Sequence, residues 1–482
     1  MKLAASPLLL MVLLAAAGQN QAQLGRSLLD LSSILPALSR PANSSRIFHA
    51  VMFDAGSTGT RIHVYTFIQG DSGKRGRPVF EVSSAYACLT VPRVSEPLPV
   101  LDNEMFHSVK PGLSAYADAP EVVSPVLAVG NAAFLCREED EAGWELIVGF
   151  EQAGHTVRML LKVAKKTVPH VDWKRTPLVL RATAGLRLLP AERAQALLDQ
   201  IQLVFDESPF FVPDDGVSIM NGTDEGILAW VSLNFLTGHL KAQSKKTVGI
   251  LDLGGGSTQI TFLPTVRKTI EDAPAADFVA RLDFLNTTFE LYSHSYLGSG
   301  IMAARLSTLG ALTTDESEWR VFQSSCLPGK FRDEWSFGGL VYRVSGEPGG
   351  PAGYKPCYQE VLKAVKGIIH QPYQLESSGV FYAFSYYYDR AVDAGLIDGL
   401  TGGTVQVRDF RKRAKEVCSD MIKNPPASPF LCMDLTYITC LLKDGFGFKE
   451  SAALQLTKKV NNVEASWALG AALDNFHELK IH

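Results

Sequence analysis

Two short segments far apart in the chain each place an aspartate after an apolar run and before glycines and hydroxyl side chains. Asp54 leads into AGSTGTR, and Asp252 leads into LGGGSTQ. Glycines let backbone N–H groups approach an anion, and Ser and Thr hydroxyls are further donors to phosphate oxygens. A carboxylate repels phosphate unless a divalent cation such as Mg²⁺ or Ca²⁺ lies between them. The pair therefore predicts a site that binds consecutive phosphates around a metal ion.

The two segments also match beyond the turn, which indicates an internal repeat. A long polar side chain, Arg61 or Gln259, follows each aspartate by seven positions. Each segment has the pattern of a strand, a tight turn and a returning strand, so two similar lobes with facing hairpins would form a cleft. The alternative is two unrelated turns that share residue types favoured in turns. The sequence contains neither a Walker-type G-x-x-x-x-G-K-[ST] loop nor a G-x-G-x-x-G fingerprint.

Strands and helices are expected on either side of the hairpins. A further strand is expected over 79–84, and residues 176–190 have the pattern of a buried parallel strand followed by a helix start. Helical segments are expected over 193–205 and 466–476, over 221–236 after an opening loop, and after the aromatic stretch that begins at 380. The hairpins would thus be attached to buried strands and flanked by helices.

Length and charge narrow the class of protein. The 482 residues are too many for one core and predict two or three domains. The net charge of −4, with scattered Lys and Arg, gives no indication of a nucleic-acid partner. Residues 1–24 have the pattern of a secretory signal peptide, with an uncleaved anchor as the alternative, and 25–45 that of a loose leader. We therefore expect a protein of the endoplasmic reticulum lumen or a secreted one, with no membrane span in the mature chain.

Seven cysteines in such a chain indicate disulfides. The nearest-neighbour pairs are Cys326 with Cys357 and Cys418 with Cys432, and the cysteines left without an assigned partner are Cys88, Cys136 and Cys440.

Three N-x-[ST] sequons fit the same compartment. We expect glycans on Asn43 and Asn286. We expect none on Asn221, because its sequon lies in a motif where a glycan would block the cleft.

The two hairpins resemble the phosphate loops of the actin, Hsp70 and sugar-kinase superfamily. Five motifs resemble, in order, the conserved regions of the apyrase family of nucleoside di- and triphosphate hydrolases; they are DAGSTGTR, ATAGLRLL, NGTDEG, DLGGGSTQ and NNVEASWALGA. The resemblance covers about residues 46–482 and is greatest to the soluble diphosphatase branch of the endoplasmic reticulum. It implies a two-lobed, ribonuclease H-like α/β fold with the active site in the interlobe cleft. The implied bounds are 46–221 for lobe I, 222–457 for lobe II and 458–482 for a C-terminal return to lobe I.

The resemblance also implies roles for the residues that act on water. Glu225 matches the base that takes a proton from the attacking water. Asp224 is the rival, with helix capping as its alternative role. Ser257 and Gln259 match residues that hold this water.

Metal and phosphate contacts follow from the same motifs. Asp54 and Asp252 match the residues that hold a hydrated Ca²⁺ or Mg²⁺ ion, with turn formation as their alternative role. Arg61 either neutralises phosphate or bridges the carboxylates of its own lobe. The phosphate-binding positions are Ser57, Thr58, Gly59, Thr60, Arg61, Thr183, Gly255 and Gly256.

A nucleobase needs a flat apolar clamp. Tyr386 and Tyr437 lie in segments that resemble the base-stacking segments of the family, with a place in the core as the alternative. Trp467 matches the tryptophan of the last motif and either packs between the lobes or contacts ligand.

Residues 119–154 have no counterpart in the resemblance. They are either a surface insertion or a sequence artefact such as translated intron. The helix that follows in the family is expected to resume near His155 and to run to about Lys166.

The leading hypothesis is a metal-dependent nucleoside diphosphatase that converts UDP or GDP into the monophosphate and phosphate. The resemblance implies that it removes the UDP left by glucosyl transfer and so supports glycoprotein quality control. The second hypothesis is a nucleotide-binding switch of the actin or Hsp70 kind, which acts through protein partners; a phosphotransferase is the third. We expect a nucleoside diphosphate as the partner, and a monomer or weak oligomer.

Overall fold

The computed structural model describes residues 46–69, 100–117, 141–240, 246–284, 287–311, 320–349, 352–375, 379–422 and 428–478. Residues 48–67 and 101–482 belong to one unit, and the second unit, 1–47 with 68–100, is described only at the ends of strands. The expected signal peptide, leader and strand over 79–84 lie outside the described residues. The same holds for Asn43, Asn286, Cys88 and Cys136.

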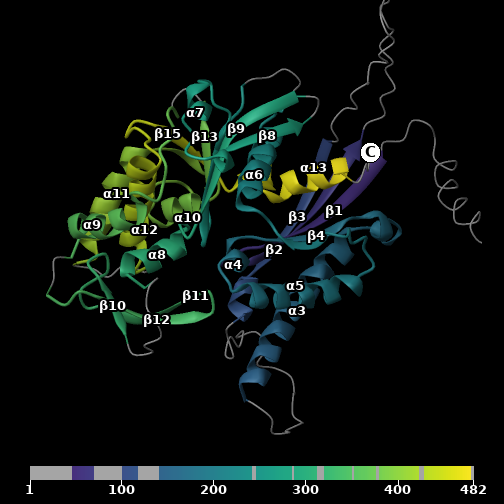
Figure 1. Ribbon diagram of the computed structural model, residues 1–482, viewed down its shortest axis with the longest axis horizontal. Coiled ribbons are helices and arrows are strands. Elements are labelled where there is room, and N and C mark those ends of the chain that lie inside the picture. Colours follow the sequence, from purple (N-terminus) through teal and green to yellow (C-terminus); the bar gives the residue numbers. More distant parts are fainter. Residues whose placement is uncertain are drawn as a thin grey trace, which may run out of the picture. The chain divides into compact units, whose positions relative to one another are not determined.

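A five-stranded sheet carries the first hairpin. Its strands are β1 (Arg46–Ala55), β2 (Thr60–Gln69), β3 (Val100–Val109), β4 (Leu178–Ala182) and β5 (Val217–Ile219), in the order β3-β2-β1-β4-β5. β1 and β4 are parallel. Side chains alternate along β1, because successive residues of a strand face opposite sides. Val51 and Phe53 pack with α3 (Glu141–Thr167) and α5 (Ala191–Asp206), and Met52 packs with α13 (Ala468–Glu478) on the other face (Figure 1).

A seven-stranded sheet carries the second hairpin. Its strands are β6 (Gly249–Leu253), β7 (Ser257–Phe262), β8 (Val279–Phe284), β9 (Thr287–Leu297), β13 (Phe381–Ser385), β14 (Gly403–Gln406) and β15 (Ala453–Leu456), in the order β14-β15-β13-β6-β7-β9-β8. β6 and β7 are antiparallel, and Asp252 lies opposite Gln259. Both strands are buried along their whole length.

Helices cover both faces of this second sheet (Figure 1). α6 (Gly222–Leu236) and α13 pack against one face. The larger core on the other face contains α8 (Ile301–Leu309), α9 (Tyr354–Val365), α10 (Tyr386–Asp393), α11 (Val407–Asp420) and α12 (Leu431–Cys440). Burial of both faces explains why β6 is an almost continuous apolar run interrupted only by Asp252, whereas β7 buries polar side chains as well.

The remaining elements are short. They are η1 (Leu113–Tyr116), η2 (His170–Arg175), α4 (Ala184–Arg187), α7 (Lys268–Glu271), η3 (Ala276–Phe278), β10 (Val321–Ser324), β11 (Arg332–Phe337), β12 (Leu340–Gly346), the π-helical turn η4 (Leu441–Gly445), β16 (Lys459–Val460) and β17 (Val463–Glu464). Strands β10, β12 and β11 form a separate small sheet.

Disulfide bonds join Cys326 to Cys357 and Cys418 to Cys432, the two pairs expected from the sequence. Cys440 at the end of α12 is a free, buried thiol. No helix within the described ranges is both long and apolar enough to cross a membrane.

Helix α6 begins earlier than the sequence indicated. It starts at Gly222, so Glu225 lies in the first helical turn and not in a preceding loop. The cause is Asn221, whose side-chain oxygen accepts a hydrogen bond from the Thr223 N–H at 2.9 Å and so caps the helix.

Helix α3 also begins earlier, at Glu141 rather than near His155, and so starts within the segment 119–154. The division of the chain into lobe I, lobe II and a C-terminal return stays a prediction.

Candidate active site

The two glycine hairpins meet at one cavity of about 370 Å³. The first hairpin lines it with Asp54, Gly56, Ser57, Thr58, Gly59 and Arg61, and the second with Asp252, Gly254, Gly255, Gly256 and Ser257. A Cβ at Gly255 would lie 2.5 Å from the Ser57 Oγ and 2.7 Å from the Thr58 Cγ2. Only glycine therefore lets the second hairpin approach the first this closely, and the amides of both can face one anion.

Three buried carboxylates lie at the cavity: Asp54, Asp252 and Glu225 are each between 5% and 7% exposed. Burial, and then repulsion by the two aspartates, raises the pKa of Glu225 to about 8, although the positive charge of Arg187 lowers it. Burial is also the main reason that the pKa of Asp252 rises to about 6, and Asp54 adds to it.

The acidic residues fit a divalent cation. The Oδ1 atoms of Asp54 and Asp252 are buried, and each lacks a hydrogen-bond partner among the described residues. Carboxylate oxygens without donors are ligands suited to Mg²⁺ or Ca²⁺. Within the described ranges, no three His, Cys, Asp or Glu side chains converge as a ready-made metal site. Water and phosphate oxygens would therefore supply much of the coordination of such an ion, as is common for Mg²⁺.

Two arginines pair with these carboxylates. Arg61 lines the cavity and its Nη1 lies 2.7 Å from the Asp54 Oδ2, so it contacts a carboxylate of its own hairpin. Arg187 at the end of α4 donates from Nη2 to the Glu225 Oε2. Arg187 is not predicted as a site residue from the sequence, although it lies in the motif ATAGLRLL. Its partner is distant in sequence, and the residue type alone does not distinguish it from other arginines.

Glu225 and Asp224, the rival candidates for the base, differ in position. Glu225 is buried and lines the cavity, whereas Asp224 is exposed and does not. Helix capping is provided by Asn221 rather than by Asp224. The geometry therefore favours Glu225 as the group that can reach a bound phosphate.

Ser257 and Gln259 are arranged in two layers. Ser257 lines the cavity, and Gln259 lies behind it, donating from Nε2 to the Ser257 Oγ at 2.8 Å and to the Ser295 Oγ at 2.9 Å. Gln259 thus orients the serine rather than facing the cavity itself. Thr60 also lies behind the cavity, fully buried, whereas Thr183 lines it.

The aromatic predictions have different outcomes. Tyr386 lines the cavity at the start of α10. Tyr437 does not, and the prediction that it stacks on the base is wrong: it is 2% exposed inside the core around α12, where its hydroxyl donates to the Ser299 carbonyl at 2.5 Å. Trp467 is buried and also forms part of the cavity wall.

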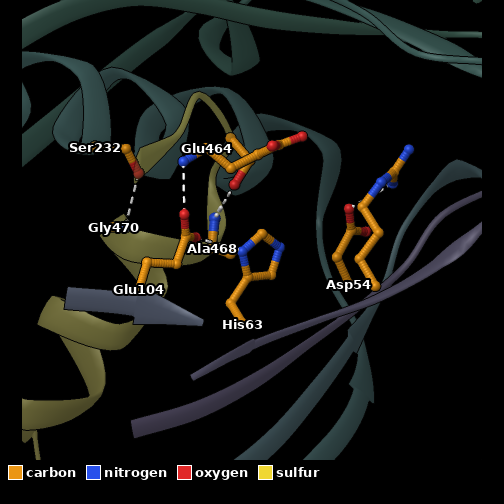
Figure 2. A network of polar contacts seen from close by, with 9 residues as sticks. Asp54, His63, Glu104, Ser232, Glu464, Ala468 and Gly470 are labelled. Carbon is orange, nitrogen blue, oxygen red and sulfur yellow. Dashed lines mark hydrogen bonds and ion pairs between the residues drawn. The ribbon is translucent and has the colours of Figure 1, made fainter. Parts of the chain in front are cut away.

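A polar network holds the C-terminal part of this wall, which runs from Glu464 to Trp467. Figure 2 shows Glu104 on β3 accepting a hydrogen bond from the Glu464 backbone N–H at 2.7 Å, with His63 beside it. The Nδ1 of His63 lies 2.8 Å from the other oxygen of Glu104. Further along, the Gly470 N–H donates to the Ser232 Oγ of α6 at 2.7 Å (Figure 2). These contacts tie the segment before α13 to β3 and the first turn of α13 to α6, and none of them is predicted from the sequence.

One cavity residue has an unusual backbone. Ser385, between β13 and α10, has φ 55° and ψ −128°, which a side chain other than glycine rarely adopts. Its hydroxyl lies beside Asp252 and favours the ionised form of that carboxyl, which burial otherwise raises in pKa.

In this mixed α/β fold, two glycine hairpins and a buried glutamate share one cavity, and the comparisons place the protein among the phosphatases. The chain belongs to the GDA1/CD39 (nucleoside phosphatase) family, whose sequence model matches residues 41–129 and 149–482. Enzymes of this family depend on a divalent cation. The match leaves 130–148 uncovered, so the stretch without a family counterpart is shorter than 119–154.

Individual relatives extend over most of the chain. Ectonucleoside triphosphate diphosphohydrolase 5 of Gallus gallus is 51% identical, over 93% of this chain and 91% of that protein. The nucleoside diphosphate phosphatase ENTPD5 of Homo sapiens is 49% identical, over 91% of this chain and 89% of that protein. Ectonucleoside triphosphate diphosphohydrolase 6 of Mus musculus is 44% identical, over 92% and 86%. Among solved structures, a nucleoside triphosphate hydrolase of Neospora caninum covers 96% of this chain and 98% of its own, with a TM-score of 0.57 and 14% identity, which is a likeness of fold.

Proposed function

We propose that the protein hydrolyses the terminal phosphate of a nucleoside diphosphate, UDP or GDP, to give the monophosphate and phosphate, with Mg²⁺ or Ca²⁺ bound. The observation that carries the proposal is the position of Glu225, a buried carboxylate in the same cavity as both hairpins. In its ionised form this carboxylate offers no donor to phosphate, so its use there is to accept a proton from water. The names of the relatives support a nucleotide as substrate.

Different residues of the cavity would hold the metal ion and bind the phosphates. A divalent cation held by Asp54 and Asp252 would neutralise phosphate charge. Backbone amides of both hairpins and the hydroxyls of Ser57 and Thr58 bind the phosphate oxygens. Catalysis of this kind consists mostly of positioning and charge stabilisation.

The chemical step uses water. Ser257, oriented by Gln259, holds a water molecule next to the terminal phosphorus. The water oxygen forms a bond to phosphorus as the bond to the bridging oxygen breaks, and Glu225 takes the proton released by the water. The nucleoside monophosphate leaves with the bridging oxygen, and no phosphorylated enzyme is formed.

The activity is tested by measuring phosphate and nucleotide products from UDP, GDP, ADP and UTP, with Mg²⁺, with Ca²⁺ and with a chelator. We expect one phosphate released per UDP or GDP, slower turnover of ADP and UTP, and none with the chelator. A bound nucleotide that is not turned over would instead support a switch of the actin or Hsp70 kind.

We further propose that the enzyme works in the endoplasmic reticulum lumen or outside the cell, where removal of UDP would support glycoprotein glucosylation and folding quality control. Two disulfides support an oxidising compartment. Expression in secretory cells, followed by fractionation and glycosidase treatment, tests this proposal. A cytosolic, unglycosylated chain would contradict it.

A further inference from the structure

A buried ion cluster lies behind the wall of the cavity that contains Tyr386. Its centre is Asp434 on α12, which is fully buried. The guanidinium of Arg305 on α8 donates two hydrogen bonds to this carboxylate, from Nε at 2.8 Å and from Nη2 at 2.6 Å. A second arginine, Arg390 on α10, approaches the same carboxylate with Nη1 at 3.4 Å.

Arg390 connects this cluster with the cavity. It lines the cavity, and its guanidinium lies over the ring of Tyr386 at 5.4 Å from the ring centre. The two residues are four positions apart on α10, which places them on the same side of the helix. If the ring of Tyr386 stacks on a base, the Arg390 guanidinium lies within reach of the edge of that base.

The hydrogen bonds of Arg390 are incomplete. Its Nη2 also lies 3.0 Å from Asp393, but its Nε is buried and meets no acceptor in the part of the chain that the structure describes. Asp434 is shared with Arg305, so it neutralises the two arginines only in part. A buried donor without a partner is costly, and a ligand that supplies an acceptor oxygen would remove the cost.

We propose that Arg390 is a specificity residue for the nucleobase, that Asp434 is the residue that positions it, and that the ligand is a base with a carbonyl oxygen on its edge. The inference rests on the proposed nucleoside diphosphatase function. Arginine has only donors, so it binds the O4 of uracil or the O6 of guanine. Cytosine and adenine carry an amino group at these positions, which is itself a donor and meets no acceptor on Arg390.

The test compares Arg390→Met and Arg390→Lys with the wild-type enzyme on UDP, GDP, CDP and ADP, with Mg²⁺ present. For Arg390→Met we expect kcat/KM for UDP and GDP to fall about tenfold or more, the usual effect of losing a hydrogen bond that involves a charged group. Values for CDP and ADP should stay within about twofold, so the preference for UDP over ADP collapses. Arg390→Lys keeps the charge without the planar fork and should lose much of the same preference.

Inorganic imidodiphosphate, which has two phosphates and no nucleoside, separates base recognition from phosphate binding. Its inhibition constant should be unchanged in Arg390→Met. An inhibition constant that rises in step with the loss of UDP activity would overturn the proposal and assign Arg390 to phosphate. An unchanged preference for UDP over ADP in both variants would overturn it as well.

Asp434→Asn tests the positioning role. It should lose the same preference as Arg390→Met and also unfold at a lower temperature, because it leaves buried Arg305 without its anionic partner and leaves Arg390 with Asp393 alone. A lower melting temperature with the preference intact would show that Asp434 only stabilises the fold. Arg411→Met is the matched control, since Arg411 pairs with Glu450 and does not line the cavity. If wild-type enzyme hydrolyses no UDP, the proposed function itself fails, whereas wild-type activity with unaltered variants refutes only this inference.

Discussion

Arg187 at the end of α4 donates a hydrogen bond to Glu225 in the first turn of α6, and the two residues come from different motifs. Gly222 leaves the room for this contact, because a Cβ there would lie 2.4 Å from the Nη1 of Arg187. Arg187 thereby fixes the direction of the carboxylate and opposes the effect of burial on its pKa.

Loss of Arg187 should change the pH dependence of the reaction. Burial raises the pKa of Glu225 to about 8 and Arg187 lowers it, so Arg187→Met should raise it further. The acid limb of the plot of kcat/KM against pH should move to higher pH, and activity at pH 7 should fall about tenfold or more. Arg187→Lys should recover part of the loss. An equal fall at every pH would show that Arg187 does not act through the protonation of Glu225.

Stabilisation by the cation should depend on pH. The folded-state pKa is raised from 4.5 to about 8 for Glu225 and from 3.8 to about 6 for Asp252. A raised folded-state pKa means that the folded protein binds the proton more tightly than the unfolded chain. The stability that these groups contribute without metal is therefore present below about pH 4 and is lost as the pH rises through 6 and 8.

The measurement is the melting temperature with a chelator and with Mg²⁺ between pH 5 and pH 8. We expect Mg²⁺ to raise it more at pH 8, because the ionised carboxylates are the ligands and binding to the folded state alone stabilises it. Asp54→Asn combined with Asp252→Asn should abolish the difference. An increase of the same size at every pH would contradict this explanation.

The strained backbone of Ser385 predicts opposite effects on stability and activity. Ser385→Gly should raise the free energy of unfolding by about 1 kcal/mol, because glycine adopts φ 55° without strain. Ser385→Ala keeps the strain and should bring no such gain. Both variants should lose activity, because both lack the hydroxyl beside Asp252. Chemical denaturation and phosphate release check the two effects separately, and a glycine variant no more stable than the alanine variant would refute the strain.

Close contact between the hairpins predicts that Gly255→Ala inactivates the enzyme without unfolding it. Its Cβ would lie 2.5 Å from the Ser57 Oγ and 2.7 Å from the Thr58 Cγ2, so these side chains or one of the hairpins must shift. We expect at least a tenfold fall in kcat/KM, since small displacements at a reacting centre are costly. Gly329→Ala is the matched control, because its Cβ would meet only the Glu347 carbonyl at 3.5 Å. Normal activity of the Gly255 variant would show that the loops do not need this approach.

The sequence was sufficient for those parts of the site that are local in the chain. Asp54, Asp252 and the glycines occur in a repeated strand–turn–strand pattern, and the structure places them at one cavity. The local sequence patterns over 176–190 and 193–205 likewise predict the strand β4 and the helix α5.

Contacts between distant segments could not be predicted. Tyr437 and Tyr386 both lie in segments that resemble the base-stacking segments of the family, but α12 is buried on every side, so Tyr437 is a core residue. Arg390 and Asp434 are 44 residues apart and meet only because α10 and α12 pack together. The start of α6 lies earlier than the sequence predicts because Asn221 caps the helix, a role that its N-x-[ST] sequon does not indicate.

The role of Glu225 is tested most directly by comparing Glu225→Gln with Asp224→Asn, since these neighbouring acids of one helical turn differ in burial. Phosphate release from UDP with Mg²⁺ is measured for both, together with binding of imidodiphosphate to confirm an intact site. If Glu225 is the base, kcat falls about a hundredfold or more in Glu225→Gln, with binding retained, and Asp224→Asn keeps near wild-type turnover. Wild-type turnover by Glu225→Gln would contradict this role.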